Sequence, residues 1–190
     1  MAEAASQLIA TAGLEGVTVR DVAQAVGCST AVVSHYFHNK RELLLFTYRY
    51  SIESASARAD HPMGPGADDL KGYIAALLPL DDERRTNWKI WFAFWAKATA
   101  DEEVALIQRD CVRRTRADLL KVLDSLDRHG GLYEGVDQPD LARRILLQVM
   151  GLSVQAVFDP QDWTVERQTA FMQAELEPYL RPEPARVSVA

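Results

Sequence analysis

Four side chains between Thr30 and His35 have the types and the spacing needed to contact the edges of DNA bases. Thr30, Ala31, Ser34 and His35 recur on one side of a predicted helix, whereas Val33 marks the opposite side. The methyl groups of Thr and Ala can contact thymine, and Ser and His can exchange hydrogen bonds with base edges. The pattern therefore indicates sequence-specific contacts in the major groove.

The residues before this helix predict the turn that would present it. Thr18 is a favourable N-cap for a helix that ends near Gly27, with Asp21 in its first turn. Gly27 permits a left-handed backbone, and Ser29 is expected to cap the next helix. The buried side of that helix is expected to consist of Val32, Val33 and Phe37. Two short helices joined in this way form a helix-turn-helix, in which Thr18 and the helix start beside it could also hold a phosphate.

A second group of side chains could bind a small molecule. The stretch WKIWFAFW places Trp88, Trp91, Phe92 and Trp95 on one helical face, at spacings of three and four. Aromatic faces bind cations, at up to ~2 kcal/mol when desolvated, and several together recognise quaternary ammonium groups. Acidic side chains that could add charge complementarity are Asp101, Glu102, Glu103 and Asp110. The alternative is that the aromatic residues only pack a core.

The cysteines and histidines do not form a pattern typical of catalysis or metal binding. Cys28 and Cys111 are too few for a disulfide framework or a zinc site. Cys111 is expected on the inward face of a helix and is grouped with the aromatic residues as a ligand contact; a redox sensor and an inert buried thiol are the alternatives. The sequence lacks a Gly-rich phosphate loop and the GxSxG, HExxH and CxxC motifs. We therefore expect no enzyme, no metal and no cofactor.

The composition sets the class of protein. The chain has 190 residues, of which 48% are hydrophobic and 25% are charged, as in a globular protein without a membrane span. A formal net charge of -6 argues against a basic protein that coats nucleic acid without specificity. Residues 1–50 contain as many acids as bases, so the negative excess lies further along the chain. These features favour a cytoplasmic protein that contacts DNA, if at all, near its N-terminus.

Helical periodicity continues through the whole chain. Additional helices are expected over residues 2–12, 39–60, 68–78, 81–100, 102–129, 139–158 and 164–180. His61 to Gly66 contains two prolines and two glycines and is expected to form a loop. With no strand pattern, the prediction is an all-α fold of about nine helices.

The runs AQAVGCS and TAVVSHYF, and Tyr36-Phe37 placed just before Lys40, resemble the DNA-binding domain of TetR-family transcriptional regulators. The resemblance implies that Tyr36 and Lys40 grip DNA phosphates. It also implies a DNA-binding domain at residues 1–46 and a ligand-binding and dimerisation domain at residues 47–190. The later WFAFWAKA resembles the choline-responsive BetI-type branch, in which this helix lines the ligand cavity. Ser34 departs from the family pattern, because many relatives carry Tyr there.

The predicted helix over residues 139–158 is too apolar for a solvated surface. Gly151 and Ser153 would allow a second backbone to approach closely. Together with residues 164–180 it could form a four-helix bundle across a two-fold axis. A dimer would place two recognition helices in successive major grooves ~34–36 Å apart, so the operator should be a near-palindrome.

These observations predict a ligand-responsive transcriptional regulator, most simply a repressor, which binds double-stranded DNA as a homodimer. A small-molecule effector, cationic or quaternary ammonium, would release it from the operator. One alternative is a helical DNA-binding regulator that is controlled by a partner protein instead of a ligand. Another is a helical interaction module with no role on DNA.

Overall fold

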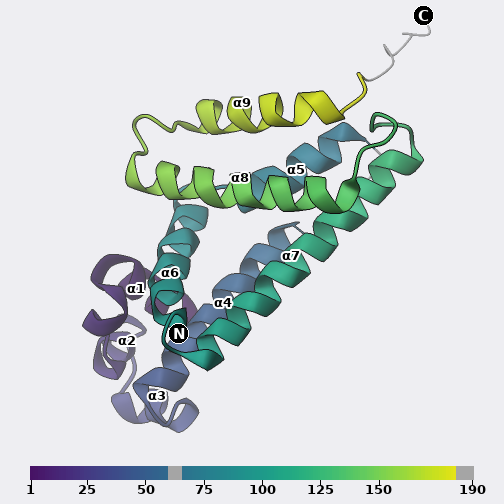
Figure 1. Cartoon of the computed structure of the whole chain (residues 1–190). Coiled ribbons are helices and arrows are strands. Elements are labelled where there is room, and N and C mark those ends of the chain that lie inside the picture. The colour runs from purple at the N-terminus through teal and green to yellow at the C-terminus, as the bar shows by residue number, and fades with distance from the viewer. Residues whose placement is uncertain (60–65, 183–190) are drawn as a thin grey trace, which may run out of the picture. The chain divides into compact units, whose positions relative to one another are not determined.

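The computed structural model describes residues 1–59 and 66–182, and these residues fold almost entirely into helices (Figure 1). The helices are α1 (Ala2–Gly16), α2 (Val19–Ala25), α3 (Thr30–Tyr36), α4 (Lys40–Ala59), α5 (Ala67–Leu77), α6 (Asp82–Ala98), α7 (Glu102–Arg128), α8 (Gln138–Phe158) and α9 (Val165–Leu176), followed by the 3-10 turn η1 (Glu177–Tyr179). The described part contains no strand and one isolated antiparallel bridge, between Leu132 and Leu180. The all-α prediction is confirmed.

Short polar side chains start the helices where the sequence predicts. Thr18 and Asp21 form a capping box at α2, because each side chain accepts a hydrogen bond from the backbone N–H of the other, at 3.2 and 2.8 Å. Ser29 accepts from the N–H of Val32 at α3, and Thr164 accepts from the N–H of Arg167 at α9. Such caps each contribute ~1 kcal/mol, so the helix starts are encoded locally.

Some predicted boundaries are wrong. The expected end of the first helix at Ala12 is correct, because Gly13 is non-helical with φ 71° and ψ 174°, but residues 14–16 form one further helical turn that was not expected. The last helix ends at Leu176, not Leu180, and Pro178 lies in the 3-10 turn that follows. Of the predicted loop from His61 to Gly66, only Gly66 lies within the described residues, where it precedes α5.

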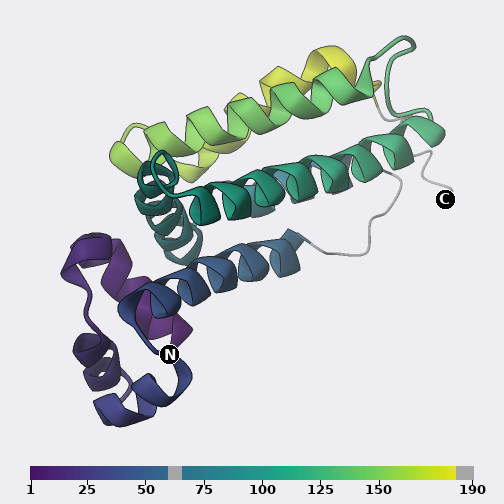
Figure 2. The ribbon, with the colours of Figure 1, turned by 60° about the horizontal axis from the view of Figure 1, so that its bottom comes forward.

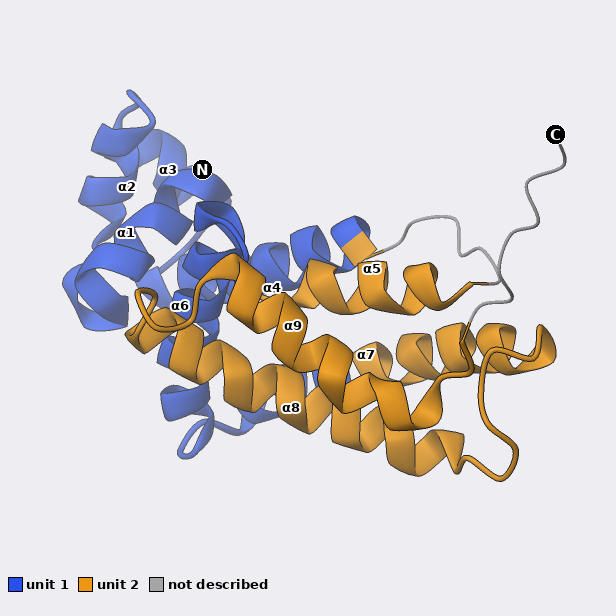
Figure 3. Cartoon of the chain, turned by 90° about the horizontal axis from the view of Figure 1, so that it is seen from above, with its two compact units in different colours: residues 1–58, 79–113 blue, residues 59–78, 114–190 orange. Residues whose placement is uncertain are grey.

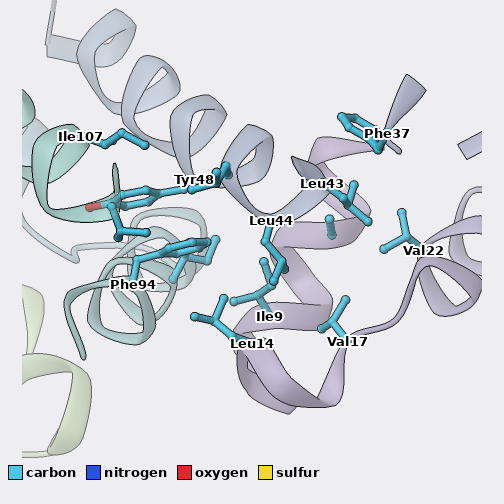
Figure 4. Close-up of a cluster of buried hydrophobic side chains, with 14 of the residues drawn as sticks. Ile9, Leu14, Val17, Val22, Phe37, Leu43, Leu44, Tyr48, Phe94 and Ile107 are labelled. Carbon is cyan, nitrogen blue, oxygen red and sulfur yellow. The ribbon is translucent and has the colours of Figure 1, made fainter. Parts of the chain in front are cut away.

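The chain forms two compact units (Figure 3). The first comprises residues 1–58 and 79–113, so α1 to α4 share a unit with α6 and the first part of α7. One continuous apolar core joins these helices, and Figure 4 shows its central side chains. It includes Ile9, Val22, Val33, Leu43, Leu44, Tyr48, Phe94 and Ile107. The helix-turn-helix is therefore anchored on the same core as α6.

Helical spacing in the sequence predicts that Leu43, Leu44, Phe46 and Tyr50 form the apolar stripe of α4, and two of these four are not buried. Phe46 is 44% exposed, and Tyr50 is only partly buried, with its hydroxyl 3.2 Å from the Glu3 carboxylate. Leu45 and Tyr48 are buried instead. The prediction missed these two residues because α4 contacts apolar side chains of other helices on more than one of its sides, so its buried residues do not form a single stripe.

The second unit comprises residues 59–78 and 114–190. Within it α8 and α9 lie side by side in both views of the ribbon (Figure 1, Figure 2), and the Gln148 amide donates to the Glu175 carboxylate between them. Helical spacing in the sequence predicts one inward stripe on α8, and the structure confirms it, because all five of its members are buried: Leu141, Ile145, Val149, Leu152 and Ala156.

Candidate DNA-reading surface and effector site

The local backbone holds α3 so that most of its surface is exposed. Gly27 adopts φ 68°, and the N–H of Cys28 returns to the carbonyl of Ala23 at 2.9 Å, which closes the turn after α2. Val33, with no exposed surface, fixes α3 on the core. The predicted base-contacting side chains Thr30, Ala31, Ser34 and His35 are all exposed. The outward half of α3 is therefore small and polar, as a major-groove surface requires.

Val32 was wrongly predicted to be buried. It is 43% exposed, because it lies about 100° around the seven-residue helix from Val33 and only the Val33 side meets the core. Tyr36, one turn along from Val32, is 63% exposed. Val32 thus adds an apolar side chain to the exposed surface of α3, where its methyl groups could contact thymine. Because valine is apolar and β-branched, the sequence alone predicted a buried residue here and not a contact with DNA.

Thr18 and Ser29 serve first as helix caps. The Thr18 hydroxyl lies 2.7 Å from a carboxylate oxygen of Asp21, which also accepts the Thr18 backbone N–H. These hydrogen bonds hold the pKa of the Asp21 carboxyl below its ordinary value. The start of α2 therefore already carries a carboxylate, which would repel a DNA phosphate at that point. Arg20, exposed beside it, is a cation that the sequence analysis did not single out.

Lys40 ties α4 to α1. Its ammonium donates to the carbonyl of Glu15, at the end of α1, over 2.9 Å, and lies 4.0 Å from the Glu15 carboxylate. A cation at a helix C-terminus satisfies an orphan carbonyl and interacts favourably with the helix dipole. With 35% of its side chain exposed, Lys40 combines this structural contact with a charge that remains accessible to a phosphate.

Arg41 pairs with the acids that follow α6. Its guanidinium donates to both carboxylate oxygens of Asp101, and to Glu103 at 2.8 Å. The Arg41 guanidinium lowers the pKa of the Asp101 carboxyl to about 2. These two acids are therefore neutralised within the first unit, and Glu102 lies 3.9 Å from Arg109. Three of the four acids expected to add charge complementarity are thus already paired with arginines, which makes the aromatic rings the main attraction for a cation.

Four of the five aromatic side chains of α6 form one cluster, which consists of Trp88, Trp91, Phe92 and Trp95. The ring of Trp88 is its centre, with ring centroids 4.9 Å from Trp91, 5.6 Å from Phe92 and 5.7 Å from Trp95. Trp88 is edge-on to both other tryptophans, so the cluster presents ring faces in different directions. Trp88 is buried, whereas the other three rings are partly exposed. Cys111 is also partly buried and, like Trp91, packs against the core of the first unit.

The outer side of α8 and α9 exposes apolar side chains. Leu147 is 68% exposed, Phe158 76%, Val165 41% and Phe171 38%. Gly151 lies on the same exposed side of α8, but Ser153 is fully buried, so the expected contribution of Ser153 to a close backbone approach is wrong. Within the described ranges α8 is the one helix long and apolar enough to cross a membrane, a weak indication that an ordinary packed helix also satisfies. An apolar face of this size typically meets another protein surface.

Most of the chain matches two known sequence families. Residues 2–45 match the description "Bacterial regulatory proteins, tetR family", and residues 66–181 match "BetI-type transcriptional repressor, C-terminal". The second match alone covers more than half of the chain. The chain belongs to the TetR family. Its relatives in that family are transcriptional regulators, which are not enzymes, and α2 and α3 are the helix-turn-helix of a TetR-family regulator.

Two curated regulators illustrate how far the TetR likeness extends. The HTH-type transcriptional regulator PksA of Bacillus subtilis (strain 168) is 28% identical over 164 residues, which span 84% of this chain and 78% of PksA. The HTH-type transcriptional regulator BetI of Burkholderia lata is 30% identical over 121 residues. That match spans 62% of each protein, so it covers less than two thirds of BetI.

Solved structures of TetR-type regulators share the fold. A transcriptional regulator from Saccharomonospora viridis, crystallised in complex with choline, superposes with a TM-score of 0.86 at 22% identity, over 95% of this chain and 96% of its own. A transcriptional regulator from Rhodococcus sp. Rha1 superposes with a TM-score of 0.79 at 28% identity, over 94% and 95% of the two chains. The TetR fold therefore extends across both units of this protein.

Proposed function

We propose that this TetR-family protein is a cytoplasmic repressor that binds a near-palindromic operator as a homodimer and is released by a small quaternary ammonium compound. DNA reading is placed in residues 1–46, and effector binding and dimerisation in residues 47–190. The observation that carries the proposal is the joint presence of an exposed polar recognition helix and an aromatic cluster on one apolar core.

The DNA contacts divide into two classes. Base edges are contacted by the outward side chains of α3, which are Thr30, Ala31, Val32, Ser34 and His35. Phosphates are contacted by Tyr36, Lys40, Arg20 and Ser29, whereas Thr18 serves as the cap of α2. The first class determines sequence preference, whereas the second determines overall affinity and its salt dependence.

Dimerisation is proposed through the exposed apolar sides of α8 and α9. Burial of Leu147 and Phe158 against a partner would remove from water the two most exposed large apolar side chains of these helices. Two α8–α9 pairs related by a two-fold axis form a four-helix interface, so each dimer presents two copies of α3. This geometry is the reason for expecting a near-palindromic operator.

The effector is proposed to bind the α6 cluster of Trp88, Trp91, Phe92 and Trp95, with Cys111 as an additional contact. Ring faces in different directions suit a trimethylammonium group, which cannot accept or donate hydrogen bonds and is attracted to aromatic quadrupoles. The choline bound to the Saccharomonospora viridis regulator makes choline the first compound to test. For effector binding to weaken operator affinity tenfold, the two states must differ by ~1.4 kcal/mol in effector affinity.

Selection of duplexes from a random pool tests the DNA part of this proposal directly. The protein should enrich a near-palindrome whose half-sites are ~10 base pairs apart or a multiple of that. Choline should quench the tryptophan fluorescence of the same preparation. Enrichment of a near-palindrome with no response to choline or other quaternary ammonium compounds would favour the second candidate, a regulator controlled by a partner protein.

Substitutions at His35 and Lys40 should separate the two classes of DNA contact. His35→Ala should change which half-site is preferred, because one base-edge contact discriminates by ~1–3 kcal/mol. Lys40→Ala should weaken binding to all duplexes alike and reduce the salt slope by ~1. Lys40→Gln is the matched control, because it can still donate to the Glu15 carbonyl but lacks the charge. If Lys40→Gln bound DNA like the wild type, the role of Lys40 would be to hold the end of α1 and not to contact a phosphate.

A further inference from the structure

A buried hydrogen-bond chain connects α6 to α4 inside the first unit. The indole N–H of Trp91 donates to the hydroxyl oxygen of Ser51 at 3.0 Å, and that hydroxyl donates to the carbonyl of Tyr48 at 2.7 Å. Ser51 is only 1% exposed, so water has little access to this chain. The Ser51 hydroxyl thus accepts a hydrogen bond from α6 and donates its one proton within α4.

Tyr48 fixes the same turn of α4 against two other helices. Its ring stacks on Phe94 of α6, with centroids 4.3 Å apart and planes 7° from parallel (Figure 4), and its hydroxyl donates to the Gln108 amide oxygen of α7. Burial raises the pKa of Tyr48 above its ordinary value, so the hydroxyl remains a donor throughout the physiological range. This turn of α4 therefore contacts Phe94 and Gln108 through Tyr48, and it contacts Trp91 through Ser51.

Trp91 has a contact on each side. Its ring lies edge-on to Trp88 in the aromatic cluster, whereas its N–H reaches Ser51 on α4. The N–H has a fixed position on a rigid ring, so a rotation of the ring that accommodates a ligand must either break the hydrogen bond or move Ser51. Breaking it removes the acceptor that the buried Ser51 supplies to the partly buried indole N–H, at a cost of up to ~1–3 kcal/mol. Movement of Ser51 is therefore favoured.

A movement of Ser51 would shift α4, which is joined to the recognition helix α3 by a short connection. Only Phe37, His38 and Asn39 separate the end of α3 from the start of α4, and Phe37 is buried in the same core. We propose that the Trp91–Ser51 hydrogen bond transmits effector binding from the aromatic cluster to α4, with Ser51 as the positioning residue. This inference rests on the proposed binding of the effector to that cluster.

Ser51→Ala tests the role of this hydrogen bond without altering a residue proposed to touch effector or DNA. We expect its operator affinity in the absence of choline, and its choline affinity in the absence of DNA, to stay within about twofold of the wild type. The factor by which saturating choline weakens operator binding should fall at least about fivefold, because the coupling loses its physical link. Fluorescence anisotropy of a selected operator duplex, with and without choline, measures that factor.

Thr47→Ala is the matched control. Thr47 is on the same helix, has no exposed surface and donates its hydroxyl at 2.8 Å to the Leu43 carbonyl within α4 itself. It should retain the wild-type coupling. The Trp91 indole N–H signal in a 1H–15N spectrum, one of four from the tryptophans of the chain, should shift in Ser51→Ala and not in Thr47→Ala.

Two results would overturn the inference on its own. One is wild-type coupling in Ser51→Ala although the Trp91 signal has shifted; the other is an equal loss of coupling in Thr47→Ala, which would indicate general loosening of α4. If choline had no effect on operator binding by the wild type, the proposed effector and this inference would both be wrong. The wild-type measurement therefore separates the two failures.

Discussion

Gly151→Arg should convert the protein to a monomer and lower its operator affinity by at least about 100-fold. A Cβ at Gly151 would meet nothing within 4 Å in the protomer, so the substitution should not disturb the fold of a single chain. At a close crossing of two α8 helices, the same side chain would collide with the partner. Loss of the dimer removes the gain from binding two linked half-sites, typically about 10²–10⁴-fold.

Gly72→Arg provides the matched control for this prediction. Gly72 lies in α5, is exposed, and likewise has space for a Cβ, but it is not on the α8–α9 face. It should remain a dimer with wild-type operator affinity. Light scattering and sedimentation measure the mass, and anisotropy measures the affinity. A dimeric Gly151→Arg protein with unchanged affinity would place the interface elsewhere.

Val33→Asp should destabilise the protein strongly and Val32→Asp hardly at all, although they alter adjacent residues of α3. Val33 has no exposed surface, so a carboxylate there should lower the free energy of unfolding by at least ~3 kcal/mol. Val32 is 43% exposed, so a carboxylate there should change it by no more than ~0.5 kcal/mol. Both proteins should lose operator binding, the first because α3 is no longer fixed and the second because it brings a negative charge to the DNA.

Denaturant unfolding, followed by circular dichroism, measures the difference between the two variants. Val32→Ala serves as the control for charge, since it should retain stability and bind the operator with altered preference at one position. Equal destabilisation by the two aspartates would mean that Val32 belongs to the core after all, as its apolar type alone suggests.

The helix-turn-helix could be predicted from the sequence because its signals are local. Thr18, Gly27 and Ser29 specify the ends of α2 and α3 through backbone hydrogen bonds and a left-handed turn, which need no distant partner. The spacing of Leu141, Ile145 and Val149 predicted the buried face of α8 for a similar reason. Capping residues and helical periodicity carry this information directly.

The remaining contacts depend on residues far apart in the chain. The pairing of Arg41 with Asp101, of Lys40 with the Glu15 carbonyl, and of Trp91 with Ser51 joins residues separated by 60, 25 and 40 positions. No local pattern distinguishes these side chains from ordinary surface charges or core residues. Val32 was misassigned for the related reason that a seven-residue helix can bury only one line of side chains, and its apolar neighbours do not identify which.

The operator dissociation constant of the wild-type protein, measured with and without choline chloride, tests control of DNA binding by the effector most directly. Binding of DNA depends on salt, so an equal concentration of sodium chloride serves as the control for ionic strength. We expect choline chloride to weaken operator binding at least about tenfold more than sodium chloride does. If sodium chloride and choline chloride weakened operator binding equally, although choline chloride quenched the tryptophan fluorescence, the aromatic cluster would not control DNA binding.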